Sequence, residues 1–343
     1  MRKIMKSTTA FFAILCVFYH SDISACDSHK DEITPYKFQT YEELETSTYA
    51  IPKASRFTTT REGNSSPDII YYLSKPAIDG TYPITIFCGG SSQKENAGTI
   101  IHVHRYFVKE FLDIGSAMIT LEQWGVDGHD IDRDVFMANY TRTQRLKDHQ
   151  QVINAIKAHP PIGWNGKFIL VGVSEGGPIV TSLTEQNQDS VLATMSWCGS
   201  GAEDWRDEMW SFLEAMDEEL PEGTRTREEF NQSVENVLLD PTAYDKEFCG
   251  MSYLYHADTL SYPLPQYSEI NTPFLVVAGA KDSGARFADE FVQKAKEASM
   301  DITYIKVDDM DHFIRKRSDV IEEALVWLRG HMQNGPERKV KLI

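Results

Sequence analysis

A serine that could act as a nucleophile stands in the most informative stretch of this chain. The apolar run 168–171 (FILV) predicts a buried strand, residues 172–176 (GVSEG) fit the G-x-S-x-G pattern around Ser174, and Pro178 suits the first turn of a helix. This pattern between a strand and a helix is typical of a nucleophile elbow, a sharp turn that small flanking residues allow to close. An ordinary glycine-rich loop is the alternative.

A serine hydroxyl is a weak nucleophile, so it needs a base and an acid that orients this base. The apolar run 274–278 predicts a strand that is followed by Asp282, and the run 302–307 predicts a later strand that is followed by His312. Both groups therefore follow strand ends, in the order serine, acid, histidine. We predict Ser174 as the nucleophile, His312 as the general base and Asp282 as the acid that orients it.

Other acidic residues could take the orienting role. Asp204 is the main rival, because it lies just beyond the strand that precedes 274–278. Asp308, Asp309 and Asp311 are close to His312 in sequence, but near neighbours usually cannot wrap round to orient their own histidine. We favour Asp282.

Three other histidines are rival bases: His256, His102 and His104. The His102-Val-His104 pair also raises metal binding, but residues at i and i+2 do not share a helix face, so we interpret the pair as structural.

The acidic stretch 127–134 resembles the start of a calcium loop. It lacks the glycine at the sixth position and the distal glutamate that such loops require, so a solvated loop is the favoured interpretation. No CxxC motif or Cys/His cluster in the sequence suggests zinc, and we predict no metal site.

Acyl transfer also needs two N–H groups that stabilise the oxyanion. The predicted strand 84–88 ends in the glycine-rich loop 89–92 (GGSS) about 85 residues before the elbow. We expect the backbone N–H of Glu175 to be one donor, and that of Gly90 or Ser91 to be the other.

The elements that must position these residues follow an alternating pattern. Apolar runs alternate with helix-period segments from residue 84 to 200, which predicts a mostly parallel sheet with crossover helices, and 55–60 with 68–74 would add an antiparallel hairpin at its edge. The other expected strands are 84–88, 116–121, 168–173, 191–197, 274–278 and 302–307, and the expected helices are 101–112, 142–159, 178–186, 286–298 and 320–331.

The alternation breaks at 201–268, which is acidic and helix-rich. We predict one α/β core, 55–200 and 269–335, interrupted by a helical cap between its sixth and seventh strands and followed by a tail at 336–343. In the cap, Trp205, Met209 and Phe212 recur at helical spacing. They either pack on the core or line an apolar substrate pocket.

The first 25 residues read as a secretory signal peptide, with a basic start, an apolar run at 9–19 and a small-residue cleavage site ending at Ala25. The Ile-Ser-Ala-Cys sequence ending at Cys26 also resembles a bacterial lipoprotein box, although Asp22 fits that box poorly. We expect a secreted or periplasmic protein, with a lipid anchor at Cys26 or a retained membrane anchor as alternatives. Residues 26–54 would form an N-terminal extension.

The net charge limits the classes of binding partner, and the cysteines bear on the redox state of the compartment. The formal net charge of −17 disfavours nucleic acid and anionic membranes as partners. In an oxidising compartment Cys198 and Cys249, which flank most of the insertion, are candidates for a disulfide, and buried thiols are the alternative. The sequence does not indicate an oligomeric state.

The segments discussed above form four motifs along the chain: CGGSS at 88–92, GVSEGG at 172–177, AGAKD at 278–282 and DDMDHF at 308–313. In these motifs the chain resembles the α/β-hydrolase superfamily, and within it the dienelactone hydrolase, acyl-CoA thioesterase and prolyl-oligopeptidase-like branches. The resemblance implies an eight-stranded, mostly parallel sheet with a cap, and acyl-enzyme chemistry without a cofactor. Cys88 stands where many members carry histidine, which argues against the HGGG esterase branch.

The expected activity is therefore that of a serine hydrolase acting on a carboxylic ester of modest size. A serine peptidase of the prolyl-oligopeptidase type is an alternative, although residues 26–54 are too short for the propeller domain that often accompanies it. A thioesterase is disfavoured because an exported protein has little access to acyl-CoA. A non-catalytic binding protein on the same fold is a further alternative.

Overall fold

The structure is a computed structural model of the 343-residue chain, and it describes residues 54–61, 67–199, 201, 204–217 and 225–333. The predicted signal segment, Cys26, nearly all of the extension 26–54, and the tail 336–343 lie outside the described residues. In the described part of the chain, no helix has the length and apolar character needed to cross a bilayer.

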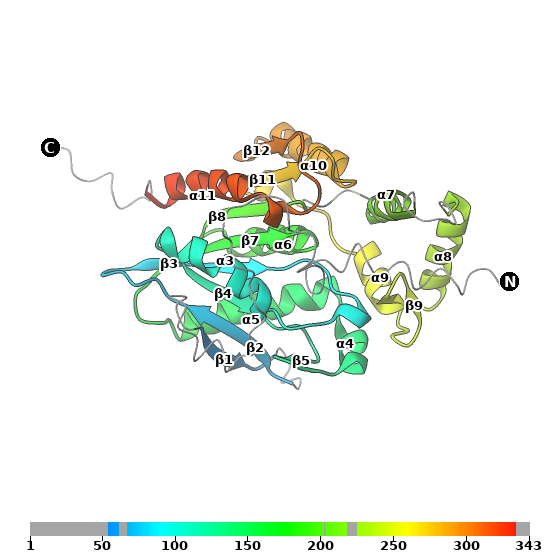
Figure 1. Cartoon of the computed structure of the whole chain (residues 1–343), viewed down its shortest axis with the longest axis horizontal. Helices are drawn as coiled ribbons and strands as arrows, with labels where there is room; N and C mark the ends of the chain where they lie inside the picture. The colour runs from blue at the N-terminus through cyan, green and yellow to red at the C-terminus, as the bar shows by residue number, and fades with distance from the viewer. Residues whose placement is uncertain (1–53, 62–66, 200, 202–203, 218–224, 334–343) are drawn as a thin grey trace, which may run out of the picture.

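One eight-stranded sheet forms the centre of the molecule (Figure 1). The first two strands pair antiparallel and the second is antiparallel to its other neighbour, whereas the remaining pairs are all parallel. The strands in sheet order are β1 (Ser55–Thr59), β2 (Ile69–Ser74), β4 (Ala117–Leu121), β3 (Tyr82–Cys88), β7 (Trp164–Val173), β8 (Val191–Trp197), β11 (Phe274–Gly279) and β12 (Ile302–Val307). The predicted eight strands and the edge hairpin are confirmed, and β7 begins earlier than expected.

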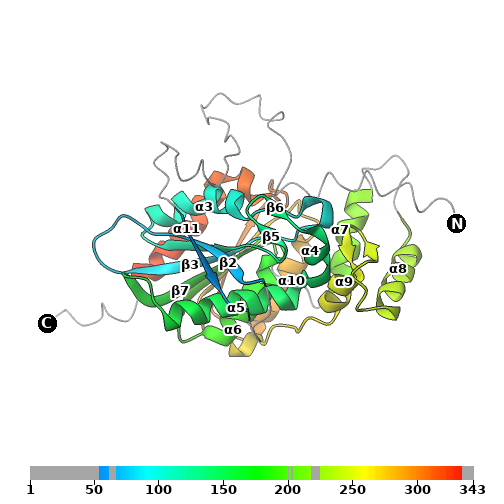
Figure 2. The same cartoon turned by 90° about the horizontal axis from the view of Figure 1, so that it is seen from below.

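Helices cover both faces of this sheet (Figure 2). On one face pack α3 (Ile101–Asp113) and α11 (Ser318–Gln333), and on the other pack α5 (Arg142–Ala158) and α6 (Gly176–Asn187). A fifth helix, α10 (Ala285–Glu297), packs against β11. The inner strands β3, β4, β8 and β11 are almost wholly buried on both faces, which is why they read as continuous apolar runs.

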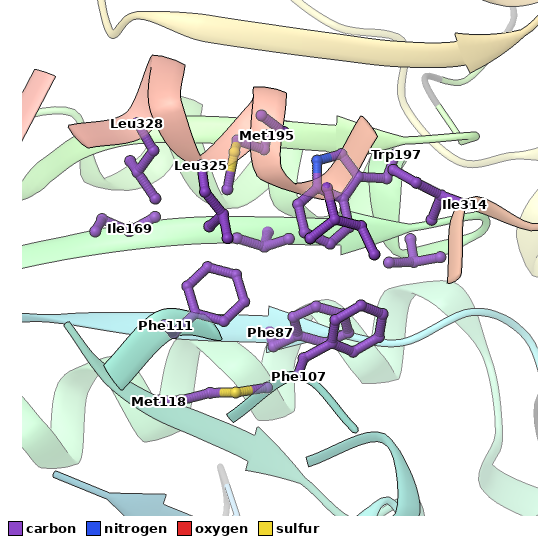
Figure 3. Close-up of a cluster of buried hydrophobic side chains, with 14 of the residues drawn as sticks. Phe87, Phe107, Phe111, Met118, Ile169, Met195, Trp197, Ile314, Leu325 and Leu328 are labelled. Atoms are coloured by element: carbon purple, nitrogen blue, oxygen red, sulfur yellow. The ribbon is translucent and has the colours of Figure 1, made fainter. Parts of the chain in front are cut away.

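The largest buried cluster lies under α3 and α11, as Figure 3 shows. Phe87 on β3 stacks on Phe107 of α3, with 4.8 Å between ring centroids, and contacts Trp197 of β8 edge-to-face at 6.1 Å. Large aromatic residues bury much apolar area and favour such offset geometries, so this cluster fixes β3 next to β7 and β8. The loops that follow these three strands are thereby held together.

The insertion between β8 and β11 is the predicted cap, which lies at one end of the molecule in Figure 1. Its first helix packs on the second through Leu213, Phe230 and Val234. A Thr226–Glu229 capping box starts the second helix. The elements of the cap are α7 (Trp205–Asp217), α8 (Arg227–Leu239), β9 (Glu247–Phe248), β10 (Met251–Ser252) and α9 (Tyr253–Leu260).

The acidic stretch 127–134 contains regular structure that the sequence did not reveal. Asp127 pairs with Arg56 at 2.9 Å, and Asp132 caps a short helix by accepting from the N–H of Val135. The elements of this region are β5 (Val126–Asp127), β6 (Asp130–Ile131) and α4 (Arg133–Asn139). These carboxylates therefore have structural partners.

Candidate active site

The chain turns sharply between β7 and α6, and Ser174 stands at the turn. Its φ is +52°, a left-handed conformation that is strained for a residue with a side chain. A Cβ on Gly172 would overlap the carbonyl of Gly176, and a Cβ on Gly176 would overlap that of Cys88. The two glycines are therefore needed for the turn to close, and the turn exposes the serine at the carboxyl end of β7.

Ser174, His312 and Asp282 are brought together by the loops that follow β7, β12 and β11. His312 Nε2 lies 3.0 Å from Ser174 Oγ, and His312 Nδ1 lies 2.9 Å from Asp282 Oδ2. An ionised carboxylate only accepts hydrogen bonds, so Nδ1 carries the proton and Nε2 is left to accept from the serine hydroxyl. The other oxygen of Asp282 accepts from the N–H of Gly284 at 2.9 Å, which holds the carboxylate in place.

The charge environment favours a basic histidine. Burial by itself would lower the pKa of His312, but the charge and hydrogen bond of Asp282 raise that pKa above its usual value, with smaller contributions from Asp311 and Glu208. Asp282 is itself buried, with 3% of its side chain exposed, so water screens its interaction with the imidazole only weakly. The arrangement can remove a proton from Ser174 and keep the resulting imidazolium in place.

The rival acids have other partners. Asp204 accepts from the N–H of Arg206 at the start of α7, and Asp309 pairs with Arg317. Asp311 accepts from the N–H of Phe313 and pairs with Lys316, so it contributes charge near His312 without contacting its ring nitrogens. Within the described residues, Asp308 forms no hydrogen bond or ion pair with His312.

The rival histidines are also engaged away from the elbow. His104 lies between Ser74 and Thr120, and His256 contacts the carbonyl of Phe248 inside the cap. Burial lowers the pKa of both to about 4, which keeps their imidazoles neutral at physiological pH. His102 lies on α3 beside His129, with 6.3 Å between the ring centroids.

The loop after β3 lies directly against the elbow, because a Cβ on Gly176 would meet the carbonyls of Cys88 and Gly89. The predicted oxyanion donors are the N–H groups of Glu175, Gly90 and Ser91. In the described part of the chain, these N–H groups have no acceptor in any backbone or side-chain hydrogen bond. They are thus available to a ligand atom placed beside Ser174.

The side chain of Glu175 holds the loop and the elbow together. This buried carboxylate pairs with Arg145 at 2.5 Å and accepts from the hydroxyls of Tyr140, at 3.1 Å, and Tyr255. Arg145 in turn donates to the carbonyl of Gly89 at 2.5 Å. We call Glu175, Arg145, Tyr140 and Tyr255 the loop clamp.

The loop clamp is charged. Burial alone would raise the pKa of Glu175, but the charges of Arg145 and Arg142 and the two tyrosine hydroxyls lower that pKa below its usual value. Tyr140 also accepts from the N–H of Ser92 at 3.0 Å, so the clamp holds the loop at two points. The spacing of the two candidate donor segments depends on this ionised pair.

Sequence reasoning assigned only the backbone of Glu175 and did not find the rest of the clamp. One signal was present: Arg142, Arg145 and His149 share the helix face on which Val152 and Ile156 are buried, so two arginines and a histidine extend an apolar stripe. Buried charges of this kind need partners.

The geometry can be compared with known proteins. No family model matches the sequence, and curated protein sequences give no match. Solved structures do match: an esterase of Pyrococcus furiosus superposes with a TM-score of 0.56 at 13% identity, covering 87% of this chain and 94% of that one. Brefeldin A esterase, described as a bacterial homologue of human hormone-sensitive lipase, superposes with a TM-score of 0.54 at 16% identity, covering 81% and 75%. This chain has the α/β-hydrolase fold.

A third similar structure is the acylaminoacyl peptidase of Pyrococcus horikoshii, with a TM-score of 0.55 at 13% identity. The superposition covers 89% of this chain and 45% of the peptidase, so the chain spans less than half of that protein's length. These α/β-hydrolase structures share the fold with this chain.

The cap of this chain contacts the candidate site through α7. Phe212 packs edge-to-face on His312, with 5.5 Å between ring centroids, and the Arg142 guanidinium lies 4.3 Å from the centre of the Trp205 ring. Met209 instead packs with Leu213 in the core of the cap. Of the three predicted lining residues, Trp205 and Phe212 thus face the elbow side and Met209 does not.

The predicted Cys198–Cys249 disulfide is wrong, since both residues are thiols. Cys198 packs with Trp197 in the core cluster under α3 and α11, whereas Cys249 packs in the core of the cap near Arg225. Flanking an insertion did not bring the two sulfurs together, because each belongs to a different apolar cluster.

Breaking the loop clamp should cost much stability. We expect Glu175→Gln and Arg145→Met each to lower the free energy of unfolding by about 3–5 kcal/mol, because each leaves a buried partner uncompensated. The double variant should lose clearly less unfolding free energy than the two single variants lose together. Urea denaturation of the wild type, the two single variants and the double variant measures this coupling.

Lys306→Met, which breaks an exposed pair with Asp289, is the matched control and should cost at most about 1 kcal/mol. Additive losses in the cycle would show that the two groups do not stabilise each other.

Proposed function

We propose that this protein is a serine hydrolase that cleaves a carboxylic ester through an acyl-enzyme on Ser174. The observation that carries the proposal is the continuous hydrogen-bond chain Ser174–His312–Asp282, built from the ends of three different strands. Because these segments lie far apart in the sequence, only the fold of the whole domain can bring the three side chains together.

The reaction follows from the geometry. His312 Nε2 takes the hydroxyl proton while Ser174 Oγ bonds to the ester carbonyl carbon, and Asp282 stabilises the imidazolium. The carbonyl oxygen becomes an oxyanion that receives hydrogen bonds from the N–H groups of Glu175 and of Gly90 or Ser91. His312 then gives its proton to the leaving alkoxide oxygen as the ester C–O bond breaks. Water, activated by the same histidine, releases the acid and restores Ser174.

The loop clamp fits this reaction as a positioning device. The two candidate donor segments lie on separate loops, and Arg145 ties the carbonyl of Gly89 to the side chain of Glu175. Fixed donors stabilise a developing charge without reorganising during the reaction, and loss of one such donor costs about 10²–10³ in kcat.

A panel of p-nitrophenyl esters and aminoacyl-naphthylamides tests the substrate class. We expect the esters to be hydrolysed, with the naphthylamides slower or inert. If the naphthylamides are the better substrates, the protein is a peptidase, and a panel without any turnover in folded protein would favour a binding role on the same fold. Thioesters of small thiols in the same panel test the thioesterase alternative.

We also propose that the chain is exported, on the strength of the basic and apolar pattern of residues 1–25. Expression of the full chain in a bacterial host followed by intact-mass measurement tests this. A mature mass that begins at Cys26 supports export, and a further mass increase of a diacylglyceryl group at Cys26 would assign the lipid anchor. Retention of residues 1–25 would contradict the proposal.

A further inference from the structure

A cavity of about 230 Å³ lies between the core and the cap. The loop 89–92, which carries candidate oxyanion donors, does not line it. Its wall combines residues of α5, α6, α7 and α9 with the segment that follows α9. The wall includes Arg142, Pro178, Trp205, Glu208, Thr259 and Tyr262. A cavity of about 150 Å³ holds a benzene ring, so this one has room for a ring or a short chain with a polar end.

The cavity adjoins the nucleophile elbow. Pro178 stands four positions after Ser174 on α6, and Arg142 Nε lies 3.6 Å from the carboxylate of Glu175, the residue next to the nucleophile. Helix α7 borders both places, because it supplies Trp205 to the cavity wall and Phe212 to the face of His312. The cavity thus borders α6 and α7, the two helices that also approach Ser174 and His312.

Arg142 is the unusual group in the wall. Only 4% of the residue is exposed, and its guanidinium lies over the rings of Trp205 and Tyr262 at 4.3 and 5.2 Å. Two of its nitrogens, Nε and Nη2, have no hydrogen-bond acceptor within the described residues. Burying a cation without hydrogen-bond partners is costly, so a group that lacks them in the folded protein points to a ligand.

Two more polar atoms in the same wall lack partners in the part of the chain described: Trp205 Nε1 and Thr259 Oγ1. Indole N–H groups and guanidinium nitrogens only donate hydrogen bonds, so the missing partner must be an acceptor. Glu175 is shared between Arg145, at 2.5 Å, and Arg142, whose Nε lies farther away at 3.6 Å, so Arg142 keeps donors that an anionic acceptor can use.

Glu208 limits the charge of that anion. Its buried carboxylate also lines the cavity, and a second negative charge on the ligand would be repelled by it and by Glu175. A carboxylate carries one charge, and its two oxygens match the planar fork of an arginine. A phosphate monoester dianion fits this wall less well.

We propose that the cavity is a substrate subsite in which Arg142 and Trp205 bind a carboxylate group, so that the preferred esters carry one free carboxylate. The inference rests on the proposed ester hydrolysis, which supplies the reaction at Ser174. Arg142 and Trp205 act in it as specificity residues and take no part in the proton transfers.

Two matched pairs of esters test the subsite on either side of the scissile bond. On the acyl side, mono-4-nitrophenyl adipate is compared with its methyl ester, and on the leaving-group side 4-acetoxybenzoate is compared with its methyl ester. For one of these pairs we expect kcat/KM, corrected for uncatalysed hydrolysis, to be roughly 10- to 100-fold higher for the carboxylate, as a hydrogen-bonded charge predicts.

Variants assign the preference to the wall. Arg142→Met should bring the ratio of carboxylate to neutral ester close to one, whatever its effect on the absolute rates. Trp205→Phe keeps an aromatic ring near Arg142 and removes the indole N–H together with the second ring, so it should reduce the ratio a few-fold. Arg133→Met, an exposed arginine on α4, is the matched control and should leave the ratio as in the wild type.

A binding measurement separates this inference from the proposed function. Calorimetry with monomethyl adipate and dimethyl adipate on the Ser174→Ala protein needs no turnover, and only the monoanion should bind. Binding that is lost in Ser174→Ala/Arg142→Met supports the subsite even if no ester is hydrolysed, in which case the proposed function alone fails. Equal rates for both members of each ester pair, or a preference that persists in Arg142→Met, would overturn the inference. If Arg142→Met does not fold, the wild-type ratio of carboxylate to neutral ester and its reduction in Trp205→Phe test the inference. A ratio of one in the wild type, or an unchanged ratio in Trp205→Phe, would overturn it.

Discussion

Replacing Ser174 with alanine is expected to lower kcat for ester hydrolysis by about 10⁶-fold, the loss seen when a serine nucleophile of this kind is removed. The side chain accounts for the covalent step, so the histidine and the oxyanion donors that remain can only act on water. The stability of the protein should change little, because alanine removes only a hydroxyl and keeps the Cβ that strains the backbone at this φ. Steady-state kinetics with the ester that performs best in the panel measures the loss.

A matched control uses Ser190→Ala, in the turn between α6 and β8. The Ser190 hydroxyl donates only to the carbonyl of Asn187, so kcat should stay within a factor of about two of the wild type. If Ser174→Ala retained most of the activity while Ser190→Ala behaved as expected, the nucleophile would have to be another residue.

Asp282→Asn is expected to lower kcat by about 10⁴-fold with the overall geometry kept. Asparagine can donate to the imidazole, which favours the tautomer that carries its proton on the wrong nitrogen and leaves Nε2 unable to accept from Ser174. The carboxylate that raises the pKa of His312 is also lost, so burial, which lowers this pKa, dominates.

The pH profile distinguishes this explanation from a general loss of structure. The base must be neutral, so kcat/KM of the wild type should rise with pH through the raised pKa of His312, above about 6.5. In Asp282→Asn this rise of kcat/KM on the acid side of the profile, the acid limb, should occur at lower pH, because the pKa of His312 falls. Asp289→Asn, which removes an exposed carboxylate from α10, should move neither the rate nor the limb. A limb that stays in place in Asp282→Asn would mean that Asp282 does not set the basicity of the histidine.

The sheet and the order of the site residues could be read from the sequence because parallel strands are buried on both faces. Continuous apolar runs such as 168–173 and 274–278 therefore mark the strands, and the residues just after them lie at one edge of the sheet. Ser174 and Asp282 each follow such a run, and His312 follows the partly buried edge strand 302–307, which made their convergence predictable.

The loop clamp and the cavity could not be read in the same way. Glu175 meets Arg145 from 30 positions away and Tyr255 from 80 positions away, and neither pairing leaves a local pattern. The β9–β10 hairpin has strands of two residues, too short for any alternation to show. The predicted disulfide failed because position along the chain does not indicate which apolar cluster a cysteine joins.

Labelling of the folded wild-type protein with a fluorophosphonate, followed by mass spectrometry of its peptides, tests the central claim most directly. This reagent phosphonylates a serine only where a base and oxyanion donors activate the hydroxyl. We expect one adduct, on Ser174, that is absent in heat-unfolded protein and strongly reduced in Asp282→Asn. Folded protein that takes up no label at Ser174, or takes it up at another serine, would contradict that claim.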